Sequence, residues 1–589
     1  MRIIHFWKSV VESAEEFNLK NCSVVIDGQN YFHCKYQLSR IPFTFGGDMD
    51  RYETHVHDNL MSIFKRANVK CYFVFKGGDT NINKKIKKFG RFAFDPNADK
   101  YQFLRPILLR DTSVQIVHDM GLEHAFCITE SKDDCVALAT RLGCPIISSD
   151  IEYCFKSAPY IPEPTLKFNS MTNTIECRRY TLQKFLKIHK LTKNKMVIFG
   201  VLSDSNIFPG NFFDNLLESW NVLDEECHVK NQQLISWLSD HEEQEISRSI
   251  TEYLTSEEDR SKFWEIHGCI LRNMTNTEGG FATDYLINSQ LDIGIKDPDW
   301  FEKGVVCKYV PSAYVNLFKW QVVQGSWFDR EDNNNDNTDS LLLSIDIIKY
   351  AYNLLTNYKK STLKVYHDNE NYTEISTVDP CVPRPNYDCE VSVFENGWEE
   401  INGWNLFQYF LENKGINIGM LSNLPEDCVL LIISLVYYGR RKGDASTEAR
   451  AIIMCYVLLN GHRLDNLVDT GLLAEDVREA NRVTKNYFET RRFEAGQIYD
   501  GDKMKSFDMF QFCLQQINYL NRLCGSPYVE TCYSRVYNGT FIYKMFTVLD
   551  RTSLPSDVFI SQLLKRAPSV LTLINKLIKR YEALLIADA

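Results

Sequence analysis

The stretch TESKDDCVALATRLGCPIISSDIEYCF, residues 129–155, shows how the first part of this chain is built. Asp133 to Leu142 has the apolar spacing of a helix, and CPIISSD (144–150) is a short apolar run that ends in polar residues. A helix followed by a buried strand is typical of an α/β domain. Glu130 precedes this helix, but Lys132 lies two residues further on, where a second acidic residue would complete an acidic helix start.

The same alternation extends over roughly the first two hundred residues. A helical pattern covers residues 50–67, and four further apolar runs read as strands: CSVVIDG (22–28), KCYFVFKGG (70–78), QIVHDM (115–120) and KMVIFGVLSD (195–204). Continuous apolar runs separated by helices predict strands that are buried on both faces, as in a parallel sheet. We therefore expect an α/β domain at the start of the chain.

Charged side chains follow the predicted strands at the point where each strand ends. They are Asp27, Lys76, Asp150, Glu152 and Asp204. Ligands of open α/β sheets bind outside the carboxyl ends of the strands, so we expect these groups to lie along one edge. Carboxylates gathered in this way are what two-metal phosphodiester cleavage requires, because they hold the cations that activate water.

The motifs VVIDG, FVFKGG, TESKDD with GCPIISSDIEYC, and VLSDSN resemble the asteroid family, within the flap-endonuclease (XPG-like) group of PIN-fold nucleases. The motifs cover residues 1–210. The resemblance implies a PIN-like, flap-endonuclease-like N-terminal domain and a nuclease that acts on single-stranded or 3′-overhang DNA in repair. In insects the family is also linked to growth-factor receptor signalling, so a signalling role is a further expectation.

The resemblance also implies a metal site. Asp27, Glu130, Asp150 and Glu152 match catalytic, metal-binding carboxylates of the family, and Asp204 matches the last of them, with Asn206 as the alternative. The implied cofactor is Mg²⁺ or Mn²⁺ if the site is active, and no metal if it is not.

Two positions depart from the family pattern. Lys76 stands where the second strand should end in Asp, and Lys132 stands where the acidic helix should continue. Each ammonium would oppose a cation 4 Å away by about 4 kcal/mol at an effective dielectric constant near 20. Asp79, Asp133 and Asp134 are neighbours in sequence, but their side chains point in other directions. We therefore expect impaired catalysis, with the acids neutralising the two lysines as an ion network.

A third departure lies at the start of the chain, where Arg2 and His5 occupy family glycine positions. Glycine is used where the backbone must approach a ligand closely. A basic segment, KKIKKFGR, follows the second strand, where relatives place an arch over the DNA. Its candidate phosphate-binding residues are Lys84, Lys85, Lys87, Lys88 and Arg91. A solvated charged surface is the alternative explanation of this segment.

Composition bounds the remaining possibilities. The 589 residues carry a net charge of −11, which argues against nonspecific binding of nucleic acid over the whole surface. The 18 cysteines show no zinc-finger spacing and are expected to be reduced. No apolar run is long enough to span a membrane. We expect a soluble intracellular protein, nuclear or cytoplasmic, with no membrane partner.

The chain is expected to comprise two domains, residues 1–225 and a mainly helical region, residues 226–589, with a polar linker near 331–340. Three functions stay open. The first is a degenerate nuclease that binds single-stranded DNA or DNA ends, and the second is an active metal-dependent endonuclease. The third is a scaffold whose helical region binds protein partners in growth-factor receptor signalling.

Overall fold

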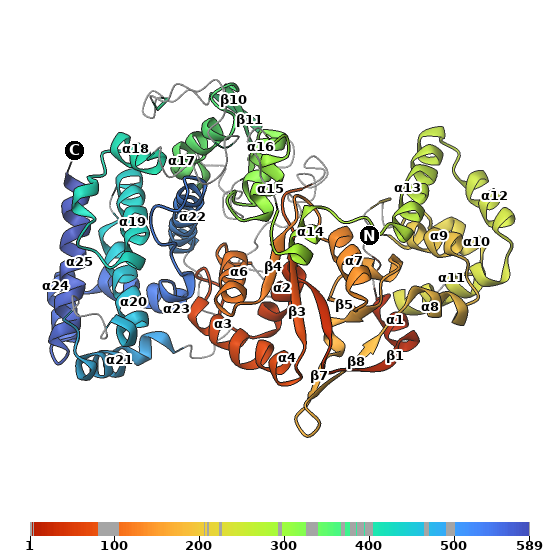
Figure 1. Cartoon of the computed structure of the whole chain (residues 1–589), viewed down its shortest axis with the longest axis horizontal. Helices are drawn as coiled ribbons and strands as arrows, with labels where there is room; N and C mark the ends of the chain where they lie inside the picture. Colours follow the sequence, from red (N-terminus) through yellow and green to blue (C-terminus); the bar gives the residue numbers. More distant parts are fainter. Residues whose placement is uncertain are drawn as a thin grey trace. The chain divides into compact units, whose positions relative to one another are not determined.

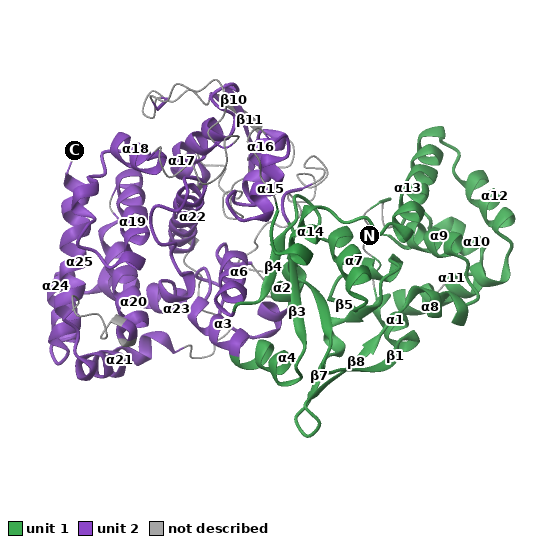
Figure 2. Ribbon diagram, viewed as in Figure 1, with its two compact units in different colours: residues 1–34, 58–76, 121–291 green, residues 35–57, 77–120, 292–589 purple. Residues whose placement is uncertain are grey.

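The computed structural model (Figure 1) describes most of the chain. The described residues are 3, 5–79, 105–204, 207–208, 211–222, 226–291, 297–324, 340–366, 372–376, 384–385, 394, 405–443, 445–464, 471–489 and 501–587. They form two compact units, coloured separately in Figure 2. Unit 1 comprises Met1–Cys34, Asp58–Lys76 and Gly121–Leu291, and unit 2 comprises Lys35–His57, Gly77–Met120 and Asp292–Ala589.

The centre of unit 1 is a five-stranded sheet with the order β4-β3-β2-β5-β6, in which every neighbouring pair is parallel. Its strands are β2 (Ser23–Asp27), β3 (Lys70–Phe75), β4 (Glu123–Phe126), β5 (Ile146–Ser148) and β6 (Tyr160–Pro162). Apart from their first residues, β2, β3 and β4 are buried, as expected for strands covered on both faces. The predicted parallel sheet and α/β class are confirmed.

Helices complete the α/β arrangement of unit 1. Helix α7 (Lys132–Leu142) packs on β2 and β5, and α2, which begins at Gly28 and ends at Leu38, follows β2 directly. On α2, Phe32 stacks on Phe73 and Phe75 of β3. A side chain at Gly28 would place its Cβ 2.7 Å from the Phe75 ring. The glycine that follows Asp27 is therefore required by the close approach of this turn to β3.

A second sheet in unit 1 is antiparallel, with the order β1-β8-β7. Its strands are β1 (Glu15–Leu19), β7 (Lys167–Asn169) and β8 (Thr174–Arg179). The remaining helices of unit 1 include α1 (Trp7–Ser13), α4 (Ser62–Arg66), α8 (Leu182–Ile188), α9 (Lys193–Ser203), α10 (Asp214–Ser219), α11 (Cys227–Asp240), α12 (Glu243–Tyr253), α13 (Glu257–Thr275) and α14 (Phe281–Asn288).

Two predicted strands are helices in the structure. All but the last residue of QIVHDM lie in α6 (Leu109–Asp119), and the strand in this part of the chain is β4, a few residues later. KMVIFGVLSD lies in α9, whose residues Lys195–Leu202 are all buried. A helix that is buried on every side has no polar face, so its sequence shows the same continuous apolar run as a buried strand. The prediction of a strand ending at Asp204 was wrong for this reason.

Unit 2 is mainly helical, as predicted for the later part of the chain. Its helices include α3 (Met49–His55), α6, α15 (Trp300–Val306), α16 (Tyr314–Trp320), α17 (Ser340–Leu355), α18 (Leu406–Asn413), α19 (Val429–Lys442), α20 (Ser446–Leu464), α21 (Ala474–Phe488), α22 (Gly501–Leu523), α23 (Gly539–Arg551), α24 (Ser556–Leu563) and α25 (Pro568–Ile586). A small sheet has the order β11-β10-β9, with β9 (Val322–Gln324), β10 (Thr362–Tyr366) and β11 (Tyr372–Ser376).

The core of unit 2 joins segments that are far apart in sequence. Helix α22 packs against α17 and α19, and α20 packs against α23 and α25. The segment 35–57 is also part of this core. Its buried Asp48 carboxylate accepts hydrogen bonds from the Thr540 amide and hydroxyl, both at 2.9 Å. Segments from both ends of the sequence thus share one core.

The structural division differs from the one expected from the sequence. Unit 1 continues past residue 225 to Leu291, and two early segments, 35–57 and 77–120, belong to unit 2. The boundary between residues 225 and 226 stays a prediction. Of the predicted linker, residues 331–339 lie outside the described part of the chain, and Ser340 begins α17. Among the described residues, none of the helices is both long and apolar enough to cross a membrane.

Candidate nuclease-type site

The carboxyl edge of the parallel sheet carries the polar groups expected from the sequence. Asp27 is the last residue of β2, and Lys76 directly follows β3. Asp150 lies just beyond β5 as the N-terminal cap of a 3₁₀ turn, Ile151–Phe155, and accepts a hydrogen bond from the Glu152 amide at 2.9 Å. Because these strands are parallel neighbours, their ends deliver the side chains to one edge.

Asp27 is the buried acid of this edge, with 1% of its surface exposed. Its carboxylate accepts hydrogen bonds from Asn30 at 2.7 Å, Tyr153 at 3.1 Å, Ser148 at 3.3 Å and Ser131 at 3.4 Å. Burial raises the pKa of Asp27, and the negative charge of Asp150 adds to that rise, while the hydrogen bonds from Asn30 and Tyr153 oppose it. The carboxylate is therefore held in one orientation by donors from four segments.

Lys132 begins α7, and its ammonium reaches two acids of the site. Its Nζ lies 2.9 Å from Asp150 Oδ2 and also donates a hydrogen bond to Glu152 Oε2. A cation at a helix N-terminus is unfavourable for the helix dipole, and the two carboxylates offset that cost. The three side chains are each about one-fifth exposed, so solvent screens the network only in part.

Lys76 forms the second lysine pair, with its Nζ 2.5 Å from Glu130 Oε1. Lys76 comes from the end of β3, and Glu130 comes from the segment between β4 and α7. Both lysines that depart from the family pattern thus contact carboxylates of the predicted site. The carboxylates that contact the two lysines are those of Glu130, Asp150 and Glu152.

The neighbouring acids are engaged elsewhere. Asp133 pairs with Lys156 at 2.6 Å, and Asp134 accepts hydrogen bonds from the Gly280 amide and the Thr283 hydroxyl at the start of α14. In unit 2, Asp79 contacts Asn316. The three acids therefore have partners outside the carboxylate cluster at the edge of the parallel sheet.

Asp204 reaches its position from α9 rather than from a strand. It is 4% exposed, forms a bridge with Ile3 and accepts a hydrogen bond from the Ile207 amide at 3.3 Å. Near the same N-terminal segment, His5 has φ = 57°, the left-handed conformation that glycine adopts most easily. The backbone at His5 therefore has a conformation that glycine adopts most easily.

Several predicted residues lie outside the described part of the chain. They are Arg2, the alternative acid position Asn206, and the basic residues Lys84, Lys85, Lys87, Lys88 and Arg91. Conversely, the sequence did not single out the residues that orient Asp27. Asn30 carries a usable signal, because it lies three residues after Asp27 at the start of a helix, but Ser131, Ser148 and Tyr153 are recognised only from the fold.

The described carboxylates do not fit a pair of divalent cations while Lys132 holds this position. Its ammonium occupies the space next to Asp150 and Glu152 that a cation bound at about 2.0–2.1 Å from their oxygens would need. The site is therefore an acidic cluster at the carboxyl edge of a parallel α/β sheet, with two lysines built into it.

Comparison with known proteins extends this assignment. A family model, the Asteroid N-terminal domain, matches residues 468–588, which lie in unit 2 from just before α21 to the end of α25. The human protein named Single-strand DNA endonuclease ASTE1 is 21% identical over 90% of this chain and 82% of its own length. Protein asteroid of Drosophila melanogaster is 28% identical over 28% of this chain and 20% of its own. The chain is similar to the asteroid family, as the motifs predicted.

Solved structures show a distant likeness. The catalytic core of Rad2 in complex with DNA substrate aligns with 47% of this chain and 89% of its own, at 13% identity and a TM-score of 0.31. Human GEN1 in complex with Holliday junction DNA aligns with 59% of this chain and 80% of its own, at 12% identity and a TM-score of 0.32. These TM-scores are low, and the fold assignment comes from the strand order and register.

Proposed function

We propose that this protein is a nuclease-fold protein that binds single-stranded DNA or DNA ends in a repair or signalling role, with catalysis impaired by Lys76 and Lys132. The observation that carries this proposal is the position of Lys132, whose ammonium contacts both Asp150 and Glu152. The Lys132 ammonium allows the carboxylates to stay close together without a metal ion. A site without a metal ion lacks the group that would activate water for cleavage.

The choice of DNA as the ligand rests on the relatives. The human relative that aligns with most of this chain is named a single-strand DNA endonuclease. In the proposal, Lys84, Lys85, Lys87, Lys88 and Arg91 contact phosphates, because a run of basic side chains in an acidic protein concentrates binding of a polyanion on one segment. The unchanged strand-end acid Asp27 then has a structural role at the edge of the sheet.

The alternative is an active metal-dependent endonuclease. One observation favours it: Asp27 is oriented by four hydrogen-bond donors, as expected for an acid whose position matters. In that case Asp27, Glu130, Asp150, Glu152 and Asp204 are the residues that would hold Mg²⁺ or Mn²⁺, and Lys132 would have to leave its two carboxylates. A protein-binding scaffold is a further alternative, for which the helical unit 2 offers the surface.

A cleavage assay separates these functions. Single-stranded, 3′-overhang and flap DNA are incubated with Mg²⁺ or Mn²⁺ and the full-length protein, Asp27→Ala, or the double variant Lys76→Asp/Lys132→Glu. We expect no cleavage by the wild type and cleavage by the double variant, because the latter restores both carboxylates. Cleavage by the wild type that Asp27→Ala abolishes would establish the active enzyme instead.

A binding assay tests the DNA part of the proposal independently. Fluorescence anisotropy with labelled single-stranded DNA is measured over a range of salt concentrations. We expect the affinity to fall with salt, and Lys84→Ala/Lys85→Ala/Lys87→Ala to flatten that dependence, because each phosphate contact contributes to the slope. Salt-insensitive or absent binding, together with no cleavage in any variant, would leave the scaffold function.

A further inference from the structure

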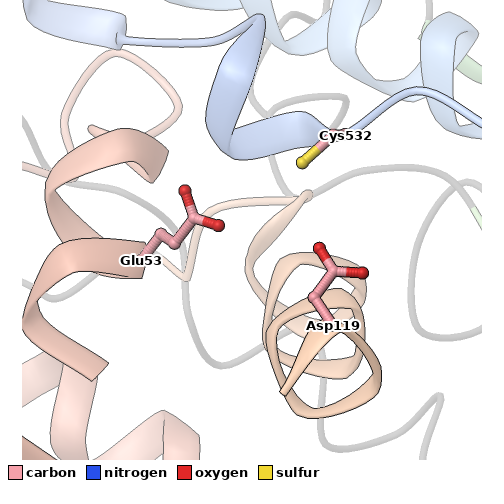
Figure 3. Close-up of side chains that lie close together, drawn as sticks. All are labelled: Glu53, Asp119 and Cys532. Atoms are coloured by element: carbon pink, nitrogen blue, oxygen red, sulfur yellow. The ribbon is translucent and has the colours of Figure 1, made fainter. Parts of the chain in front are cut away.

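A second cluster of metal-ligating side chains lies in unit 2, away from the residues of the parallel sheet. One oxygen of Glu53, one oxygen of Asp119 and the Cys532 sulfur all lie within 4.8 Å of one another. Figure 3 shows the three side chains directed towards a common space from separate parts of the chain. Neither the sequence motifs nor the family resemblance assigns these residues a role.

The three residues come from elements that pack together. Glu53 lies on α3, Asp119 is the last residue of α6, and Cys532 precedes a short 3₁₀ helix, η9 (Tyr533–Arg535). All three elements contact one another within unit 2. A ligand bound by the three side chains would therefore join three segments of one core.

The position of Cys532 is fixed by its neighbours. Gln115 lies one helical turn before Asp119 on α6, and its side chain donates to the Thr531 carbonyl at 2.7 Å and accepts from the Tyr533 amide at 3.1 Å. The backbone on both sides of Cys532 is thus attached to the helix that carries Asp119. Residues four apart on a helix lie on the same face, so this attachment places the thiol next to the carboxylate.

The two carboxylates of this cluster have no lysine or arginine ion pair among the described residues, although the charge of Arg535 acts on the Cys532 thiol. Among the described residues, Glu53 forms no ion pair, and the contact of Asp119 is with the exposed His118, whose Nδ1 lies 3.4 Å from Asp119 Oδ1. The Cys532 sulfur lies 3.3 Å from the Ser534 hydroxyl. Two carboxylates brought together with a thiol repel each other when ionised, and a bound cation would remove that repulsion.

We propose that Glu53, Asp119 and Cys532 form a zinc site. The mixed donor set selects the metal: Mg²⁺ and Ca²⁺ prefer oxygen ligands alone, whereas Zn²⁺ binds thiolate and carboxylate together. Three protein ligands leave a fourth position for water. His118 is a positioning residue, because its contact with Asp119 orients the carboxylate from outside the site.

The geometry needs only a small contraction to bind zinc. Bond lengths of about 2.0 Å to oxygen and 2.3 Å to sulfur place the tetrahedral ligand atoms of such a site about 3.3–3.5 Å apart. The three ligand atoms lie within 4.8 Å of one another, so a contraction of at most about 1.5 Å is needed, which side-chain torsions of Glu53 and Asp119 can supply. Glu53 is half-buried and Asp119 is exposed, so solvent gives the metal a route to the site.

Cobalt substitution tests the site in the full-length protein. Co²⁺ is a spectroscopic substitute for Zn²⁺, and a cobalt–thiolate bond gives a charge-transfer absorption in the near ultraviolet. We expect one equivalent of Co²⁺ to produce this absorption, and one equivalent of Zn²⁺ to remove it by displacement. Cys532→Ser should abolish the absorption, and Glu53→Gln should weaken metal affinity on the order of 100-fold.

Two controls make the result specific. Cys269→Ser removes an exposed thiol elsewhere and should leave the absorption unchanged. Asp27→Ala should also leave it unchanged, which separates this site from any metal bound at the edge of the parallel sheet. The proposal fails if the absorption persists in Cys532→Ser, or if Glu53→Gln and Asp119→Asn, folded by circular dichroism, bind Zn²⁺ as the wild type does.

Discussion

At the carboxyl edge of the parallel sheet, three of the clustered acids have lysine partners from the same unit, whereas Glu53 and Asp119 in unit 2 have neither lysine nor arginine partners among the described residues. Both clusters bring together carboxylates from segments that are separate in sequence. The difference lies in where the balancing cation comes from. In unit 1 the balancing cations are the ammonium groups of lysine side chains of the chain itself. In unit 2 we propose that the balancing cation is a zinc ion taken up from the solvent.

This comparison shows why acidic residues alone do not identify a metal site. An ammonium group and a metal ion can both offset the negative charge of clustered carboxylates. Only the metal ion activates water, and only the metal ion can be removed by a chelator. A chelator should therefore lower the stability contributed by the zinc site and leave the lysine site unchanged. Substitution of the lysines should do the reverse.

The largest effect is expected at Asp48, a buried acid that accepts hydrogen bonds from Thr540 and has the Arg51 guanidinium 3.6 Å from its Oδ2. Burial raises the pKa of Asp48 to about 7, and the charge of Asp50 contributes, while Thr540 and the more distant Arg51 oppose the rise. The folded state therefore binds the proton more tightly than the unfolded state. The free energy of unfolding should fall by up to ~4 kcal/mol as pH rises from about 4 to 7.

Urea unfolding at several pH values, compared between the wild type and Asp48→Asn, measures this effect. The variant should lack that part of the pH dependence, because its amide does not titrate. Asp58→Asn is the matched control, since Asp58 is exposed and should leave the dependence intact. Identical pH profiles for Asp48→Asn and the wild type would show that the Asp48 carboxyl titrates as it does in the unfolded chain.

The second effect concerns the proposed zinc site. A ligand that binds only the folded state at one hundred times its Kd stabilises that state by about 2.7 kcal/mol. Zinc should therefore raise the thermal unfolding midpoint of the wild type, and ethylenediaminetetraacetate should reverse the rise. Cys532→Ser should show no zinc-dependent shift, and an equal shift in that variant would place the metal elsewhere.

The third effect concerns Lys132. Replacing it by Met leaves Asp150 and Glu152 without their shared cation, which should lower the free energy of unfolding at pH 7 by ~2 kcal/mol, less than for a fully buried pair because the groups are partly exposed. A chelator should not change the contribution of this site to the free energy of unfolding of the wild type, because its cation is a lysine side chain. Lys184→Met, which removes a more exposed partner of Glu15, should cost at most about 0.5 kcal/mol.

The smallest effect is expected at Lys76. Its partner Glu130 is 43% exposed, so solvent screening limits the pair to less than about 1 kcal/mol. Lys76→Met should shift the urea midpoint slightly, and 1 M salt should abolish most of the difference from the wild type. A loss as large as that in Lys132→Met would mean that the two lysines are coupled through one network.

The sequence predicted the sheet because β2, β3 and β5 are short, continuously apolar and followed by charged residues. It failed where that signal is ambiguous. The run before Asp204 forms a helix whose residues Lys195–Leu202 are all buried, so it shows no polar face. Strand β4 is only four residues long and contains Glu123 and His124, so it shows no continuous apolar run. Hydrophobic periodicity does not distinguish these cases, since burial on all sides removes the periodicity itself.

The candidate site was predictable in its residues but not in its contacts. Strand ends placed Asp27, Lys76 and Asp150 at one edge, and the family pattern marked Lys132 as a departure. Which acid each lysine contacts depends on the rotation of α7 and the path of the segment before it, which local sequence does not determine. The cluster in unit 2 was not foreseen, because Glu53, Asp119 and Cys532 are distant in sequence and have no recognisable spacing.

The hydrogen bonds between Asp48 and Thr540 join residues 492 positions apart, and they have a consequence for biosynthesis. At about 5–20 residues per second, a ribosome needs roughly 25–100 s to make Thr540 after Asp48. Until then α3 and the chain around it lack the partners that bury them. The residues of this early segment that are buried in the folded protein therefore stay exposed while the rest of unit 2 is synthesised. A nascent chain of this protein should therefore bind chaperones through residues 35–57 until Thr540 has been synthesised.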